Sequence, residues 1–177
     1  MPEASRYRSL GTLAKKTRML KLYKISDTTK SYWETWENDG VHTVHWGILG
    51  TKGESKELKS SILRKAETTI QKEVDAMVAD GFRPIELEDH YTLMIEYAII
   101  GMGDTKDVDK RHRLEDKMNE ALGWTGLGNC DGGSIGSGTM EVCSFVVDFE
   151  VAKAVIKKEL SGTEFSDYTR IYDEDGG

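Results

Sequence analysis

Cysteine and proline are scarce in this chain of 177 residues, which contains two of each. The two cysteines, Cys130 and Cys143, cannot form the disulfide framework that stabilises many small secreted domains. No stretch approaches the roughly 18 consecutive apolar residues that a membrane-spanning helix needs, and the N-terminal residues lack the apolar core of a signal peptide. We therefore expect a cytoplasmic protein with reduced thiols and no contact with a membrane.

Charge is distributed unevenly along the chain, although the formal net charge is only −7. Residues 1–88 carry 15 lysines and arginines against 13 acidic residues, whereas residues 89–177 carry 9 against 18. The first 24 residues contain seven basic side chains and one acidic side chain. A basic arm of this kind can contact nucleic acid, but the acidic second half would be repelled by it.

The first half has the pattern of an antiparallel meander followed by one helix. The Asp-Gly pair at residues 39 and 40 is a strong signal for a two-residue hairpin between strands. The predicted strands cover residues 17–25, 31–38, 41–49 and 54–59. A helix is predicted over residues 60–82, with Ser60 or Ser61 capping its start and Gly81 near its end. The helix would pack on the sheet through Leu63, Ala66, Ile70, Val74 and Met77.

The second half has a different pattern, in which strands and helices alternate. We predict strands over residues 91–100, 139–148 and 168–175, and helices over 107–124 and 149–160. The glycine-rich segment between residues 126 and 138 is open to two interpretations, a turn or a short strand around residues 127–131. With that strand the order is βαββαβ, which suggests a ferredoxin-like sandwich. The fold class is therefore α+β, with a first domain over residues 1–86 and an acidic ferredoxin-like domain over residues 89–177.

The stretch "HWGILGTKGESK" at residues 45–56 contains three regularly spaced glycines. A phosphate-binding loop would lie between a strand and a helix and would need a Gly-Lys-Ser/Thr sequence, which is missing here. These glycines lie within and between two predicted strands instead. Gly50 and Gly53 are expected to bracket a hairpin turn, and Gly47 to mark a bulge or a close approach of two backbones.

The segment "YWETWENDGVHTVHWGILGTKGESKELKSS", followed by a helix that ends in "DGF", resembles a WGR domain. The likeness covers about residues 17–86. It implies an antiparallel meander packed by one helix, as the residue pattern already indicates. WGR domains occur in poly(ADP-ribose) polymerases and in bacterial proteins, and in the polymerases the domain contacts a DNA break. The Trp-Gly-Arg signature appears here as Trp46-Gly47-Ile48, so the signature arginine is absent.

The resemblance implies a set of candidate binding residues. Trp46 would pack on a sugar or on a protein partner, with Gly47 beside it, and Lys52 or Lys56 would contact phosphate. The basic arm would add Lys15, Lys16 and Arg18. The alternative for Trp46 is a structural role, as an anchor in the core or at an interface.

Other segments offer weaker candidates. Asp131, Gly132, Gly133 and Ser134 could form an anion nest or a ligand loop, although a glycine-rich turn is the simpler interpretation. Gly101 and Gly103 lack the third glycine of a dinucleotide-binding loop, and Asp104 and Asp107 suit a helix start instead. The four histidines and two cysteines have no metal-ligand spacing. We expect no cofactor.

The sequence favours a non-catalytic binding module. Its ligand would be a nucleic-acid end or phosphate, or alternatively a protein partner. The acidic second half favours a basic partner, as for an immunity-type protein that neutralises a toxin. A small-ligand enzyme is a third hypothesis, which would require converging titratable groups around residues 131–138.

Overall fold

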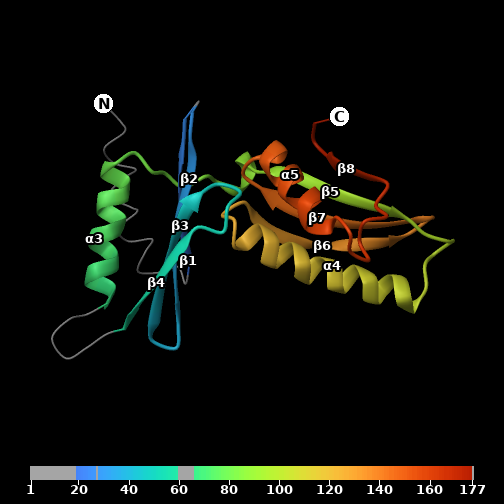
Figure 1. Cartoon of the computed structure of the whole chain (residues 1–177), viewed down its shortest axis with the longest axis horizontal. Coiled ribbons are helices and arrows are strands. Elements are labelled where there is room, and N and C mark those ends of the chain that lie inside the picture. Colours follow the sequence, from blue (N-terminus) through green and yellow to red (C-terminus); the bar gives the residue numbers. More distant parts are fainter. Residues whose placement is uncertain (1–18, 27, 60–65, 177) are drawn as a thin grey trace. The chain divides into compact units, whose positions relative to one another are not determined.

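The computed structural model describes residues 19–26, 28–59 and 66–176. The predicted basic arm, with Lys15, Lys16 and Arg18, lies outside these residues. The chain divides into two compact units between Pro84 and Ile85, and the short segment Leu49–Thr51 is grouped with the second unit. We call them unit 1 and unit 2. Figure 1 shows the elements of each unit.

Unit 1 contains a four-stranded antiparallel sheet with the strand order β1-β2-β3-β4, which confirms the predicted meander. The predicted hairpin is also confirmed, because Asp39 and Gly40 both have positive φ angles, of 50° and 76°, as this tight turn requires. The strands are β1 Met19–Ile25, β2 Lys30–Asn38, β3 Val41–Ile48 and β4 Glu54–Lys59.

Helix α3, Ala66–Ala79, packs on one face of this sheet and completes the core of unit 1. The helix contributes Ile70 and Val74 as its stripe predicts, and Gly81 follows it with a φ of 98°, which suits the left-handed end of a helix. The predicted start at Ser60 or Ser61 and the side chain of Leu63 lie outside the described residues. The buried core consists of Leu20, Leu22, Trp33, Val44, Ile70, Val74 and Phe82.

Unit 2 also contains a four-stranded antiparallel sheet, with the strand order β6-β7-β5-β8. Helices α4 and α5 both lie on the same side of this sheet (Figure 1). Two antiparallel sheets with their helices make this an α+β protein, as predicted. After a short 3-10 turn at Leu87–Asp89, the elements follow as β5 Tyr91–Ala98, α4 Thr105–Gly123, β6 Gly128–Gly136, β7 Thr139–Val146, α5 Phe149–Leu160 and β8 Arg170–Asp173.

The glycine-rich segment differs from its prediction. It contains the predicted strand, which gives the βαββαβ order, but this strand, β6, is nine residues long, and the chain turns after it at Ser137 and Gly138. The pairing of β6 with β7 is shifted at Asp131, between Cys130 and Gly132, which marks a β-bulge. Glycines do not prevent strand formation here, because β7 and α4 supply the packing that the strand's own side chains lack.

Candidate functional site

The glycines of the β3–β4 hairpin allow two backbones to pass close to each other. A Cβ atom on Gly47 would lie 2.8 Å from the Cα of Gly53, and one on Gly53 would lie 2.3 Å from the carbonyl oxygen of Trp46. The hydroxyl of Tyr32 lies over both glycines. The predicted close approach at Gly47 is therefore found. The segment is a tightly packed hairpin, and a side chain at Gly47 or Gly53 would force it apart.

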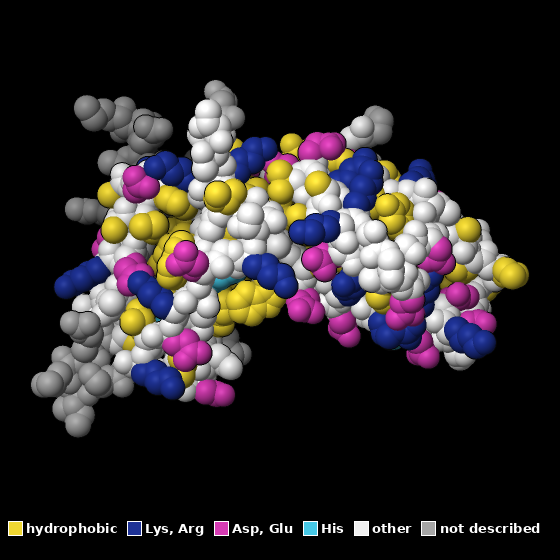
Figure 2. All heavy atoms as spheres, in the orientation of Figure 1, with side chains coloured by type: hydrophobic (Ala, Val, Ile, Leu, Met, Phe, Trp, Pro, Cys, Tyr) yellow, Lys and Arg dark blue, Asp and Glu magenta, His cyan; other side chains and the backbone are white. Residues whose placement is uncertain are grey.

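A groove of about 640 Å³ opens in unit 1 between α3 and the sheet. In Figure 2, hydrophobic side chains reach the surface between α3 and the adjoining strands. Most of the lining is apolar or aromatic, with one cation and one acid. The lining residues are Ser31, Tyr32, Trp33, Trp46, Gly47, Ile48, Lys56, Glu73, Ala76, Met77 and Phe82.

Trp46 lies both against the core of unit 1, where its ring is partly buried, and in the wall of the groove. The Nζ atom of Lys56 lies 5.7 Å from the centre of the Trp46 ring, within the range of a cation–π interaction. The same Nζ donates a hydrogen bond of 2.8 Å to Glu73 on α3. Lys56 is therefore held above Trp46 by an acidic partner.

Of Lys52 and Lys56, the two described lysines predicted to contact phosphate, the groove contains Lys56. The side chain of Lys52 is exposed and does not line it. Ile48 occupies the signature arginine position and is 59% exposed at the groove. The cation that the groove does contain, Lys56, is neutralised by Glu73. Among the described residues that line the groove, no unpaired positive charge is therefore present, as a phosphate site needs.

The opposite face of the unit 1 sheet carries a buried polar network that the sequence analysis missed. His45 is 1% exposed and Glu34 is 2% exposed. The Nδ1 atom of His45 lies 2.7 Å from Glu34 Oε1, and its Nε2 atom lies 2.7 Å from the carbonyl oxygen of Lys52 and 3.0 Å from the Tyr32 hydroxyl. The ammonium of Lys21 lies 3.2 Å from the second Glu34 oxygen. This network ties β1, β2 and β3 to the hairpin turn.

The geometry of this network assigns a hydrogen to one nitrogen of the His45 ring. The Lys52 carbonyl can only accept a hydrogen bond, so Nε2 must be the donor. Both ring nitrogens of His45 are therefore engaged, Nε2 with the turn and Nδ1 with Glu34 on β2. His45 is placed as a structural tie for the hairpin that carries Trp46.

Residues 131–134, predicted as a possible ligand loop, do not form a loop. These residues belong to β6, where their backbone groups pair with β7. On the outer edge, the Gly133 carbonyl accepts a 2.8 Å hydrogen bond from Arg111 Nη1, and the Cys130 amide donates to Asn119 Oδ1 at 3.0 Å. Arg111 and Asn119 both come from α4. The backbone groups that would form an anion nest are thus used by the sheet and the helix.

The segment before α4 is a helix start, as predicted. The Asp104 side chain accepts hydrogen bonds from the amides of Lys106 and Asp107, and Asp107 accepts one from the Asp104 amide. This reciprocal capping uses the free amides of the first turn. A dinucleotide phosphate would have to compete with two carboxylates for the same amides.

The two cysteines are free thiols on neighbouring strands. Cys130 is paired with Ser144, whereas Cys143 is paired with Gly132, because the bulge at Asp131 shifts the register. Burial, followed by the negative charges of Asp131 and Glu174, raises the pKa of the Cys143 thiol to about 11. At neutral pH, Cys143 is therefore in its reactive thiolate form in only a small fraction of the protein molecules.

This environment predicts that the Cys143 thiol reacts slowly with alkylating agents, at a rate that depends on the charge of Asp131. In a Cys130→Ser variant, iodoacetamide should alkylate Cys143 much more slowly at pH 8.5 than it alkylates free cysteine. Adding Asp131→Asn should increase the rate several-fold, because removing a negative charge lowers the thiol pKa. Asp116→Asn on α4 is the control and should leave the rate unchanged. Equal acceleration by both substitutions would contradict the prediction.

No family model, curated protein or solved structure matches this chain. The resemblance to WGR domains therefore stays a prediction. No described helix is long and apolar enough to cross a membrane. Among the described residues, no group of three or more histidine, cysteine, aspartate or glutamate side chains could hold a metal ion.

Proposed function

We propose that this chain is a non-catalytic binding module, in which a WGR-like unit 1 holds an apolar group of a protein partner in the groove beside Trp46. The observation that carries the proposal is the groove itself. An open concave site with an aromatic wall and a mostly apolar lining is the kind of surface that takes an anchoring side chain from a partner. A ferredoxin-like unit 2 is part of the proposal, supported by the strand order β6-β7-β5-β8.

The charges of the groove favour a protein partner over nucleic acid. Glu73 would repel a phosphate group and also neutralises Lys56, the groove's cation. The guanidinium of the signature arginine is replaced by the apolar side chain of Ile48. Burying an apolar side chain of a partner against Trp46 and Ile48 requires no charge. It contributes a transfer free energy of about 25 cal/mol for each Å² of apolar surface removed from water.

Recognition of a nucleic-acid end is the second candidate. The observation in its favour is the Lys56 ammonium above the Trp46 ring, since a sugar or base can pack on an aromatic face beside a cation. In this case Lys15, Lys16 and Arg18 of the N-terminal arm would supply most of the attraction to phosphate.

Two probes separate these candidates. The first is a peptide selected by panning a random display library on the full chain, and the second is a 5′-phosphorylated blunt DNA duplex. For the peptide we expect Trp46→Ala to weaken binding by roughly 30-fold, the scale of a buried aromatic anchor. Fluorescence anisotropy of the labelled probe measures the affinity.

Two further variants control for damage to the fold. Ala76→Phe keeps Trp46 but fills the groove from α3, so it should also abolish peptide binding. Trp124→Ala removes an exposed tryptophan from unit 2 and should have no effect. Salt-sensitive binding of the duplex that depends on Trp46 would instead support the second candidate. If Trp46→Ala and Ala76→Phe change the binding of neither the peptide nor the duplex, the groove is not the binding site.

A further inference from the structure

One face of the unit 2 sheet is packed by helices, and the other is not. Along β7, Met140 and Val142 are fully buried, whereas Glu141 and Cys143, which alternate with them, are only partly buried. Helix α4 contacts both β7 and α5, and the two helices lie together on the side of the buried residues. Because side chains alternate along a strand, Glu141 and Cys143 belong to the face that these helices leave uncovered.

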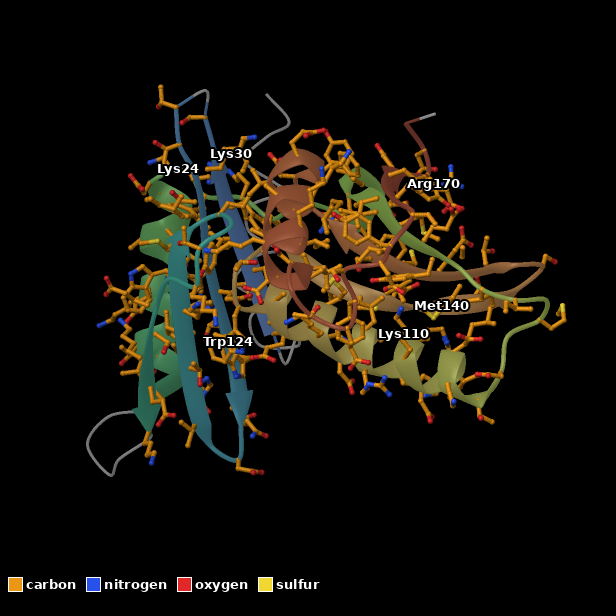
Figure 3. The ribbon with its side chains drawn as sticks, turned by 45° about the vertical axis from the view of Figure 1, so that its right-hand side comes forward. Lys24, Lys30, Lys110, Trp124, Met140 and Arg170 are labelled. Atoms are coloured by element: carbon orange, nitrogen blue, oxygen red, sulfur yellow. The ribbon has the colours of Figure 1, made fainter. Side chains whose placement is uncertain are left out.

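The uncovered face is rich in carboxylates. Glu96 on β5 lies directly opposite Glu141 on β7 in the strand register. The four strands of this sheet contain one basic residue, Arg170, which begins β8 (Figure 3). Arg170 is already bound to Glu96, with its Nη2 and Nε atoms 2.6 Å and 3.0 Å from Glu96 Oε2. Within the sheet, Glu141 therefore has no cation of its own.

Glu141 is held in place by hydroxyl groups. The Tyr172 hydroxyl donates to Glu141 Oε1 at 2.9 Å, and the Ser134 hydroxyl lies 3.4 Å from Oε2. Hydroxyl donors orient a carboxylate without cancelling its charge. The guanidinium of Arg170 also stacks on the Tyr172 ring at 4.1 Å. The result is a fixed, negatively charged group flanked by strands on both sides.

Further negative charge lies next to these residues. Asp131 at the bulge, and Glu174 and Asp175 in the tail after β8, lie close enough to Cys143 for their charges to raise the pKa of its thiol. Asp175 is anchored to β5 by a 2.7 Å hydrogen bond from the Thr92 hydroxyl. We call this surface the acidic sheet face and define it by Glu96, Asp131, Glu141, Glu174 and Asp175.

We propose that the acidic sheet face is a docking surface for a short, lysine- or arginine-rich segment of a partner protein. Charge complementarity selects this occupant, since five carboxylates face one arginine that is already paired. Strands about 4.8 Å apart give a face of four strands a width of roughly 15 Å, enough for a single extended or helical segment. This inference goes beyond the groove of unit 1, because it rests on other residues in the other unit.

The test uses the full chain and a defined probe, a fluorescein-labelled peptide of alternating lysine and alanine. We expect binding at about 20 mM salt that weakens strongly at about 200 mM, where exposed charges are screened. The double variant Glu141→Gln with Asp131→Asn should weaken binding at low salt about fivefold, as expected for the loss of two exposed ion pairs. A peptide of alternating glutamine and alanine should not bind.

A matched double variant separates this face from the net charge of the molecule. Asp109→Asn with Asp116→Asn removes the same charge from exposed positions on α4 and should leave the affinity within about 1.5-fold. Equal weakening by both double variants, or no binding by the unmodified chain at low salt, would overturn the proposal. Peptide binding that is lost in Trp46→Ala but not in Glu141→Gln with Asp131→Asn would assign the peptide to the groove and also overturn it.

Discussion

Replacing Glu34 with alanine is expected to lower the free energy of unfolding of unit 1 by about 3–5 kcal/mol. Glu34 is 2% exposed and contacts both the His45 ring and the Lys21 ammonium. Its removal leaves a buried ring nitrogen without its partner, and an ammonium close to the buried network without its counter-charge. The cost of such orphaned polar groups exceeds the net contribution of the bonds themselves.

The effect of this substitution can be measured by urea unfolding followed by tryptophan fluorescence. In a Trp124→Phe background, the remaining tryptophans Trp33, Trp36 and Trp46 all belong to unit 1, so the signal reports that unit. Glu57→Ala, at an exposed position on β4, is the control and should change stability by less than about 0.5 kcal/mol. A loss below about 1 kcal/mol for Glu34→Ala would show that the network is not coupled to folding.

The sequence predicts the elements of this protein best where one residue pattern dominates. The meander follows from the alternation of its strands and from the Asp-Gly turn at residues 39 and 40, and α3 follows from the spacing of Ile70 and Val74. These are local signals, and each depends on only a few neighbouring residues. The α+β class could be predicted because the same signals recur along both halves of the chain.

Features that depend on distant residues could not be predicted in this way. Strand β6 is poor in side chains that favour strands, and it forms because β7 pairs with it and Arg111 and Asn119 bind its outer edge. The Glu34–His45 contact depends on the register between β2 and β3, which places these two residues opposite each other. A two-residue turn at Asp39–Gly40 fixes this register, and counting back from the turn places Glu34 opposite His45.

Trp46 shows why a motif alone does not determine a site. The likeness to WGR domains predicts its position on a displayed hairpin, and the described groove is built around it. What the groove binds depends on neighbours that the motif does not include, such as Glu73 on α3, which pairs with Lys56. This pairing changes the expected ligand from a phosphate to an apolar group.

Gly53→Ala should show how far the groove depends on the hairpin. The new methyl group would enter the space occupied by the Trp46 carbonyl and the Tyr32 hydroxyl, at a backbone φ of 62°. A left-handed alanine costs roughly 1–2 kcal/mol and overpacking about 1–3 kcal/mol more, so we expect a loss of about 3 kcal/mol. Urea unfolding in the Trp124→Phe background again provides the measurement.

Gly40→Ala separates the two contributions to this loss. Gly40 has a similar φ of 76°, but a Cβ atom there meets nothing within 4 Å. The substitution should therefore cost only the backbone term, about 1 kcal/mol. The difference between the two variants measures the close contacts with the Trp46 carbonyl and the Tyr32 hydroxyl. Equal losses of stability in Gly53→Ala and Gly40→Ala would contradict this prediction, because they would mean that the hairpin can relax around the methyl group.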